Sequence, residues 1–297
     1  MRAVLAEVAG IATIVFAASS MLSVGLAYRF GAIIEPLLQP RAVFRALVAN
    51  FVLVPLLAIG IERLIPMDPP LALGLFLLAG AAGAPFLIKL ASAARGNLAL
   101  SAALLMILVP ATVVFLPFYV PLAAAHPSLR AIEYVPSSIL SIGLPLLSTL
   151  LLPIAIGLAA RAAAPCWATR LVPVGAKVAS IALVVVIVTV FWANFHELMR
   201  VLRTGAIAAG VLLVVSAFAV GYLLTQPQRS AVLGLGTAQR NIAGAMVIAS
   251  RDFSNPDILV MISACALAGL LVLFPIAWLL GKRAPHVGLP TPESSSA

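Results

Sequence analysis

The sequence predicts an all-α polytopic membrane protein with about nine transmembrane helices. Hydrophobic residues make up 63% of the 297 positions and charged residues only 9%, a balance that soluble domains do not show. The apolar segments reach about the 20 residues that a helix needs to cross a bilayer, and most charges lie between them. Their long continuous runs lack the alternation of a membrane barrel, so each span is expected to be helical.

The N-terminal segment permits two interpretations. Arg2 and the small residues at positions 17–20 resemble the charged start and cleavage region of a signal peptide. Glu7 interrupts that pattern, and the apolar run continues to Tyr28. We therefore expect the segment to be retained as the first span, over about residues 8–28.

Eight further spans follow in order, bounded by polar loops and by Gly and Pro. They cover about residues 43–65, 71–94, 97–120, 139–158, 174–195, 205–225, 229–250 and 258–280. Residues 1–283 would thus form one transmembrane domain. Residues 284–297 have no apolar period and are expected to be a disordered cytoplasmic tail.

The basic residues of the short loops predict the orientation of the chain. With the N-terminus outside, the cytoplasmic side receives most of them: Arg29, Arg41, Arg45, Arg95, Arg161, Arg170, Lys177, Arg229, Lys282 and Arg283. We expect a protein of the plasma (inner) membrane with its C-terminus in the cytoplasm. The net charge is +9, but the basic residues form no face with interleaved aromatic residues. No nucleic-acid partner is therefore predicted.

Two of the spans contain small residues that interrupt an otherwise apolar run. In the third span the break lies in AGAAGAP, which contains Gly83 and Pro85. In the eighth span it lies at Gly234 to Thr237, with Gly236 in the middle. The two spans enter from opposite sides of the membrane in the orientation above, as an inverted repeat requires.

A cation follows each break. Arg240 lies eleven residues from the basic residue at either end of its span, and flanks of about 16 Å would place it near the bilayer midplane. Half-helix N-termini add partial positive charge at such breaks. We therefore predict a midplane site for an anion, formed by Arg240, Gln239, Asn241, Thr237 and Lys89, with Asn50 and Ser101 as candidate lining residues.

A structural interpretation competes at each of these positions. Gly and Pro in membrane helices often serve close packing, and Asn50 and Ser101 could each make an ordinary interhelical hydrogen bond. Lys89 is six residues from Arg95, so its ammonium could reach the cytoplasmic surface. Arg240 could bind helix-terminal carbonyl groups instead of a substrate.

The sequence also lacks the residues that several other functions need. Outside the loops and helix ends the predicted spans contain no Asp, Glu or His, so neither a proton relay nor a carboxylate-based sodium site is expected. No catalytic triad, metal-ligand spacing or phosphate loop is present. Cys166 and Cys265 lie in no paired motif. We predict neither an enzyme nor a bound cofactor or metal.

Several of these residues resemble the bile acid:sodium symporter family. Arg95 to Asn97 followed by Ala99 to Ser101 resembles the family's segment after its first crossing helix. Gln239, in the run GTAQRN, resembles the glutamine of the second crossing helix. Weaker matches lie in residues 21–26 and 50–55, and the resemblance covers nearly all of the chain.

This resemblance implies a fold and a function. Two broken helices would cross at the centre of a core domain, formed by the second to fourth and seventh to ninth spans. The first, fifth and sixth spans would form a panel domain. Relative motion of the two domains would carry a small organic anion across the bilayer by alternating access.

The sodium ligands that the resemblance implies are incomplete here. Leu235 and Arg240 stand where the family has a glutamate and an asparagine, Leu105 stands in place of a threonine, and Asn50 replaces a glutamine, while Ser101 matches a serine ligand. Arg240 would also repel sodium. We hypothesise that fixed cations replace bound sodium, leaving a transporter or exchanger that does not need it.

Two other functions are compatible with the sequence. One is a small-solute efflux permease of the arsenite type, although no thiolate constellation surrounds Cys265. The other is a membrane sensor or assembly subunit, in which the polar residues around Arg240 only hold helices together.

Overall fold

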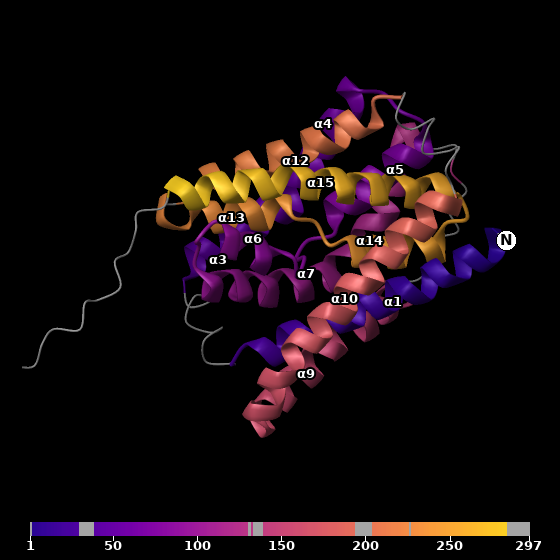
Figure 1. The fold of residues 1–297 in the computed structure, drawn as a ribbon. Helices are drawn as coiled ribbons and strands as arrows, with labels where there is room; N and C mark the ends of the chain where they lie inside the picture. The colour runs from indigo at the N-terminus through magenta and orange to yellow at the C-terminus, as the bar shows by residue number, and fades with distance from the viewer. Residues whose placement is uncertain are drawn as a thin grey trace, which may run out of the picture.

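The described part of the chain folds into helices joined by short non-helical segments and contains no strand (Figure 1). A computed structural model describes residues 2–29, 39–129, 132, 139–193, 204–225 and 227–283. The predicted tail at 284–297 lies outside these residues. The elements are α1 (Arg2–Ala27), α3 (Pro40–Val48), η1 (Ala49–Leu53), α4 (Val54–Leu64), α5 (Pro69–Gly80), α6 (Leu87–Ala93), α7 (Leu98–Ala124), η2 (Pro127–Leu129), α8 (Ile139–Leu146), η3 (Leu147–Leu151), α9 (Leu152–Ala163), α10 (Pro165–Ala193), α12 (Ala206–Leu223), α13 (Pro227–Ala238), α14 (Ile242–Asp252) and α15 (Pro256–Arg283).

Length and composition confirm the predicted class of polytopic helical membrane protein. Within the described ranges, 7 helices are long and apolar enough to cross a bilayer. They cover Glu7–Ala27, Pro40–Leu64, Leu98–Ala124, Ile142–Ala163, Pro165–Val186, Ala206–Leu223 and Pro256–Arg283. The pairs α5–α6 and α13–α14 consist of shorter helices. The count of nine spans, which treats each pair as one span, stays a prediction.

Two of the long helices contain a π-helical turn just before a proline. Asn50 lies in η1, which joins α3 to α4 and is followed by Pro55. The second turn, η3, joins α8 to α9 and is followed by Pro153. A proline inside a helix removes one backbone donor and crowds the preceding turn, and a π-turn is a common accommodation. In η1 this turn helps to set the position of the Asn50 side chain.

Helix α10 begins earlier than the sequence predicted. Its first residue is Pro165, whereas the predicted span starts at about residue 174. Proline is well tolerated in the first turn of a helix because the amide hydrogens there have no intrahelical acceptor. The charged segment before the predicted span is therefore helical rather than a loop.

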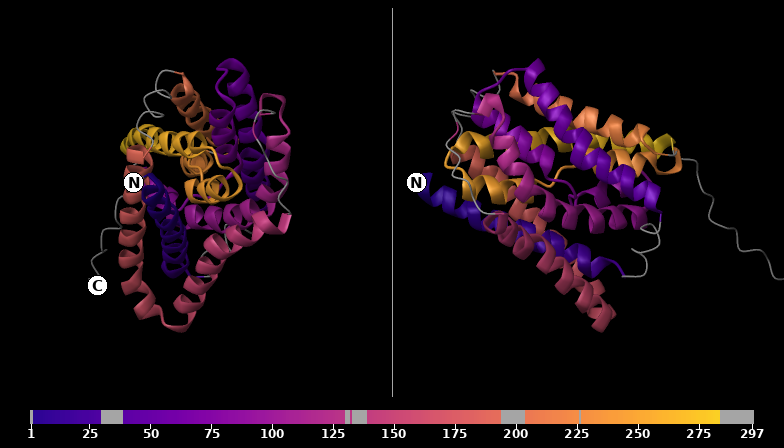
Figure 2. Two further views of the ribbon diagram at one scale, coloured as in Figure 1. Left: turned by 90° about the vertical axis from the view of Figure 1, so that its right-hand side faces the viewer. Right: turned by 180° about the vertical axis from the view of Figure 1, so that it is seen from behind.

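Helices α1, α9 and α10 pack against one another on one side of the molecule. Figure 2 shows α9 and α10 as the two arms of a V with α1 between them. A Cβ atom at Gly25 of α1 would clash with the backbone carbonyl of Ile154 in α9, so their close approach requires glycine. The remaining helices, including α4, α5, α7, α12, α13 and α15, pack together on the other side.

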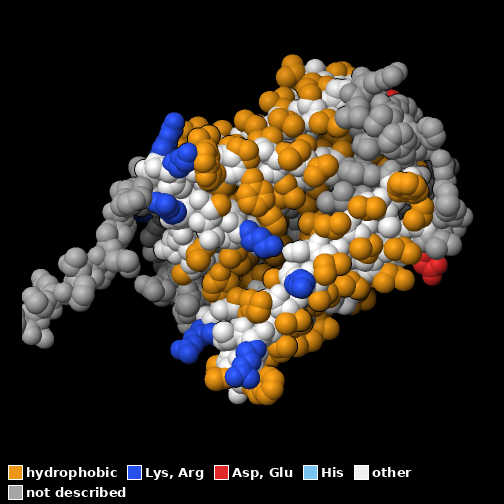
Figure 3. Space-filling view, in the orientation of Figure 1, with side chains coloured by type: hydrophobic (Ala, Val, Ile, Leu, Met, Phe, Trp, Pro, Cys, Tyr) orange, Lys and Arg blue, Asp and Glu red, His pale blue; other side chains and the backbone are white. Residues whose placement is uncertain are grey.

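Charged and apolar side chains are separated on the surface. Figure 3 shows a mainly hydrophobic surface, with Lys and Arg side chains gathered toward the end of the molecule where α15 ends. Helix α15 carries Lys282 and Arg283 in its last turn. Gly281 packs against the backbone of Ala93 and Ala94 after α6, so Arg95 lies near the same end. This distribution is typical of a membrane protein, in which the exposed apolar side chains contact lipid and the basic side chains lie outside the apolar layer.

Candidate functional site

The two interrupted helices meet at their breaks. The first break covers residues 81–86, between α5 and α6, and the second covers residues 239–241, between α13 and α14. The predicted position of the second break was wrong, because Gly234 and Gly236 lie inside α13. A Cβ atom at Gly234 would come 3.0 Å from the Phe218 ring, and one at Gly236 would come 3.1 Å from Leu87. These two glycines allow close packing between helices.

Asn241 joins one break to the other. Its backbone N–H donates to the carbonyl of Ala81 at 2.9 Å, and its side-chain Nδ2 donates to the carbonyl of Gly83 at 3.1 Å. Its Oδ1 accepts a hydrogen bond from the N–H of Gly244 at 3.0 Å, which caps the start of α14. One buried side chain thus begins a half-helix and holds the opposite break in place.

Helix α7 supports the first break from the other side. The hydroxyl of Thr112 accepts a hydrogen bond from the N–H of Ala82 at 3.0 Å and donates one to the carbonyl of the same residue, also at 3.0 Å. Gly83 has φ +79° and lies against Val109, where a Cβ atom would come within 2.9 Å of the backbone nitrogen. Glycine is required here by both conformation and space. The sequence does not indicate this role of Thr112, because a single threonine in an apolar helix carries no distinguishing signal.

Arg240 has all of its donors occupied by protein oxygens. Nε donates to the carbonyl of Leu78 at 3.1 Å, and Nη2 donates to the carbonyls of Ala79 and Asn50. Nη1 donates to Oδ1 of Asn50 at 2.7 Å and to the carbonyl of Thr237 at 3.1 Å. A guanidinium group has five N–H donors, so none is left for a substrate.

The hydrogen-bond acceptors of Arg240 explain why a charged side chain is buried at the second break. Leu78 and Ala79 belong to the last turn of α5, and Thr237 to the last turn of α13. The carbonyl groups at a helix C-terminus lack intrahelical donors and carry partial negative charge. One guanidinium therefore satisfies two half-helix ends at once, which is the structural role that the sequence left open for this arginine.

Asn50 completes this network from η1. It is fully buried, and its Nδ2 donates to the carbonyl of Ala46 at 2.9 Å and to Oγ1 of Thr237 at 3.4 Å. Neither Asn50 nor Thr237 borders the cavity described next. They lie behind Arg240 and fix its position.

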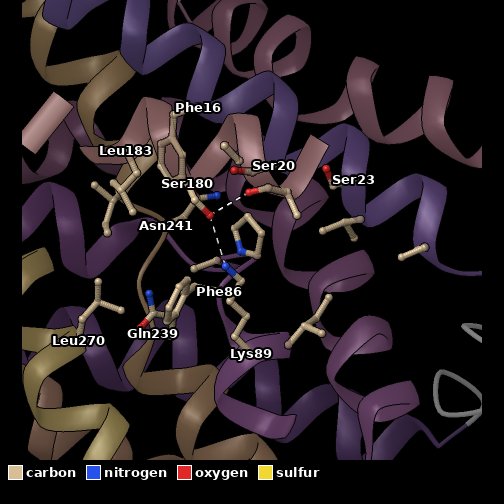
Figure 4. A pocket seen from close by; sticks show the side chains of 18 of the residues that line it. Phe16, Ser20, Ser23, Phe86, Lys89, Ser180, Leu183, Gln239, Asn241 and Leu270 are labelled. Carbon is tan, nitrogen blue, oxygen red and sulfur yellow. Dashed lines mark hydrogen bonds between the residues drawn. The ribbon is translucent and has the colours of Figure 1, made fainter. Parts of the chain in front are cut away.

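A cavity of about 330 Å³ lies between the two breaks and the helices α1 and α10. This volume is at the lower end of the range for small-molecule pockets. Figure 4 shows side chains from both sides around it. Its lining includes Phe16, Ser20, Val24, Ala84, Pro85, Phe86, Lys89, Val172, Ala176, Ser180, Leu183, Gln239, Arg240, Asn241 and Ile242.

The cavity contains polar groups that are available to a ligand. Gln239 is only 5% exposed, and its side-chain amide makes no hydrogen bond within the described ranges, although it borders the cavity (Figure 4). Ser20 of α1 is also buried, and its hydroxyl likewise lacks a protein partner there. The polar atoms of both side chains are open to the cavity rather than sealed in the protein. A ligand could supply the missing hydrogen bonds.

Lys89 reaches across the cavity. Its Nζ donates to Oγ of Ser180 on α10 at 3.3 Å and lies 5.3 Å from the centre of the Phe86 ring (Figure 4). No Asp or Glu is among the residues that line the cavity. The N-terminus of α14, with its partial positive charge, also borders it at Ile242. The cavity is therefore apolar with positive charge at one side.

The structure places the predicted site residues in three groups. Gln239, Asn241, Arg240 and Lys89 border the cavity, whereas Asn50 and Thr237 bind Arg240 behind it. Ser101 does neither, since its hydroxyl donates to the carbonyls of Asn97 and Leu98 in the first turn of α7. Ser20 and Ser180 are among the cavity residues that the sequence did not indicate. Both lie in long apolar helices, where a serine commonly bonds its own helix.

The oxygen atoms around Arg240 do not fit a bound sodium ion. A sodium site needs several free oxygen ligands, and here the carbonyls of Leu78, Ala79 and Thr237 and the side chain of Asn50 accept hydrogen bonds from the guanidinium. The positive charge of Arg240 opposes a second cation at the same place. Among the described residues there is also no cluster of His, Cys, Asp or Glu that could hold a metal ion.

The chain matches a known protein family. The family profile described as Sodium Bile acid symporter family matches residues 14–201. This range begins within α1, includes the first break and all of α10, and ends before α12 and α13. No curated protein sequence matches the chain.

Proposed function

Because the chain belongs to the sodium bile acid symporter family, we propose that it is a secondary active transporter of a small organic anion. The observation that carries this proposal is the cavity at the two breaks, where the free amide of Gln239 and the ammonium of Lys89 face an apolar space. An amphipathic anion matches both parts of that lining.

Gln239, Lys89 and Ser20 are the proposed contacts of the anion. Lys89 would supply the opposite charge, while Gln239 and Ser20 would donate hydrogen bonds to its oxygen atoms. Arg240 would act at the same site without touching the anion, by holding the ends of α5 and α13. The residues that line the cavity include no carboxylate that would repel the ligand.

We further propose that transport does not require sodium. In this proposal the guanidinium of Arg240 neutralises the half-helix ends that a bound cation would otherwise neutralise. The support is its full set of hydrogen bonds to backbone carbonyls and to Asn50. A covalently attached cation cannot be released on one side of the membrane, so it cannot couple a sodium gradient to uptake.

Alternating access would move the helices that carry the breaks against α1, α9 and α10. The cavity lies between these two groups, so sliding of one past the other would change the side to which it opens. The proposed orientation has the N-terminus outside and the basic ends of α9 and α15 in the cytoplasm. The protein would then be an integral protein of the plasma (inner) membrane.

Uptake by the purified protein in liposomes tests this function. We expect uptake of an anion from a panel of benzenesulfonate, octanesulfonate, mandelate and taurocholate, at equal rates in sodium and potassium buffers. Sulfonates stay ionised and leak slowly through lipid, and protein-free liposomes measure that leak. Sodium-stimulated uptake that Gln239→Ala abolishes would rule out sodium independence. If none of the anions is transported or raises the unfolding temperature, the proposed function fails.

A further inference from the structure

We propose that this carrier is an obligatory anion exchanger, in which the empty cavity reorients slowly because the charge of Lys89 is then uncompensated. The inference rests on the proposed transport function and adds to it the mode of coupling. It depends on where Lys89 lies and on what surrounds it.

Lys89 lies at the boundary between the two groups of helices. It belongs to α6, directly after the first break, and its Nζ contacts Ser180 of α10 across the cavity (Figure 4). Relative motion of the two groups must change this contact. The ammonium would then have to move along the face of α1 and α10 that lines the cavity.

That face offers hydroxyl groups to the ammonium of Lys89 but no negative charge. The lining from α10 is mainly apolar, with Val172, Ala176 and Leu183. The lining from α1 and its end combines Phe16 and Val24 with the hydroxyl groups of Ser20, Ser23 and Tyr28. No Asp or Glu lines the cavity. Lys89 is exposed in this conformation, so its charge is hydrated here, and the cost falls on the motion that closes the cavity to this side. The unpaired ammonium group would then lie against a mainly apolar face away from water, which is energetically costly. An anion bound beside Lys89 would neutralise the charge and lower that cost.

Arg240 does not create the same barrier. Its guanidinium is held by oxygens of α5, α13 and Asn50, all in the group of helices that carries the breaks. These contacts can move with it and need not be broken. In a sodium symporter the coupling cations leave before the empty carrier returns, but Lys89 is covalently attached. The carrier would therefore return quickly only with another anion bound.

Counterflow in liposomes tests this inference. The external probe is radiolabelled octanesulfonate, and the liposomes contain either unlabelled octanesulfonate or potassium sulfate, with valinomycin to clamp the membrane potential. We expect uptake into the octanesulfonate-loaded liposomes to be at least about tenfold faster, which corresponds to about 1.4 kcal/mol in the barrier for return. Equal rates into both kinds of liposome would overturn the proposal. Net uptake driven by a pH gradient would also overturn it, because Lys89 could then return after releasing its proton.

Variants at Lys89 identify the responsible charge. Lys89→Gln should bring the ratio of exchange to net uptake close to one, even if affinity for the probe falls, while Lys89→Arg should keep the ratio high. A high ratio in Lys89→Gln would assign the barrier to another group and overturn the role of Lys89. Failure of transport itself would appear differently, as the absence of both exchange and net uptake together with no thermal stabilisation by the probe.

Discussion

Arg240 donates a hydrogen bond of 2.7 Å from Nη1 to Oδ1 of Asn50, joining the second interrupted helix to the π-helical turn of a neighbouring helix. Both residues are buried. The same guanidinium binds the last turns of α5 and α13. The contact between Arg240 and Asn50 therefore connects three segments that are distant in the sequence, and it lies immediately behind the cavity.

Removal of the Asn50 side chain should destabilise the protein. In Asn50→Ala, Nη1 of Arg240 loses a buried acceptor, and we expect a loss of about 1–3 kcal/mol in the free energy of unfolding. The measurement is thermal or denaturant unfolding in detergent. Ser216→Ala is the matched control, because the Ser216 hydroxyl bonds only carbonyls of its own helix. Equal stability of the two variants would contradict the role assigned to Asn50.

Replacement of Arg240 by a neutral residue should create a demand for a cation. In Arg240→Asn the carbonyls of Leu78 and Ala79 lose their donor, so stability should fall. Sodium chloride should then raise the unfolding temperature of the variant more than potassium chloride does, because sodium can bind the freed oxygens. The wild-type protein should show no such difference. A sodium-specific rise in the wild type would mean that a cation site exists beside the guanidinium.

Gly83→Ala should be much more destabilising than an alanine at an unconstrained glycine. The φ of +79° at Gly83 costs an alanine about 1–2 kcal/mol. Its Cβ would also crowd the backbone of Val109, which adds about 1–3 kcal/mol. Gly60→Ala in α4 is the control, since a Cβ there meets nothing within 4 Å. Similar unfolding temperatures for both variants would show that the first break can relax.

Substitution of Gln239 should affect binding rather than folding. The amide has no protein partner in the described structure, so Gln239→Ala should leave the unfolding temperature without ligand nearly unchanged. Its affinity for a transported anion should fall by up to about tenfold, the value of one hydrogen bond. The isosteric Gln239→Glu should bind more weakly still, because its carboxylate repels the anion. Isothermal titration with benzenesulfonate measures both, and unchanged affinity in the two variants would remove Gln239 from the site.

Some of the site could be predicted because its signals are local in the sequence. Small residues and Pro85 inside an apolar run indicate an interrupted helix wherever the rest of the chain lies. The polar residues from Gln239 to Asn241 indicate a second polar segment at membrane depth in the same way. The position of that break was nevertheless misplaced onto Gly234 and Gly236, since glycine serves close packing as often as it ends a helix.

The contacts of each side chain could not be predicted, because they depend on how helices cross. A buried arginine can bind a ligand or a helix end, and the sequence is compatible with either role for Arg240. Ser20 and Ser180 are separated by 160 positions and border one cavity only because α1 packs against α10. Thr112 matters only because α7 passes beside the first break.

The sequence by itself determined that this protein lies in a membrane, that two of its helices are interrupted, and that cations follow the breaks. Hydropathy and backbone chemistry act over neighbouring residues, so a linear reading is sufficient for these features. Only the tertiary structure decided that the donors of Arg240 are used by the ends of α5 and α13, while Lys89 and Gln239 border the cavity. Each donor binds the acceptor that the crossing of the helices brings within about 3 Å. No single segment of the sequence specifies that geometry.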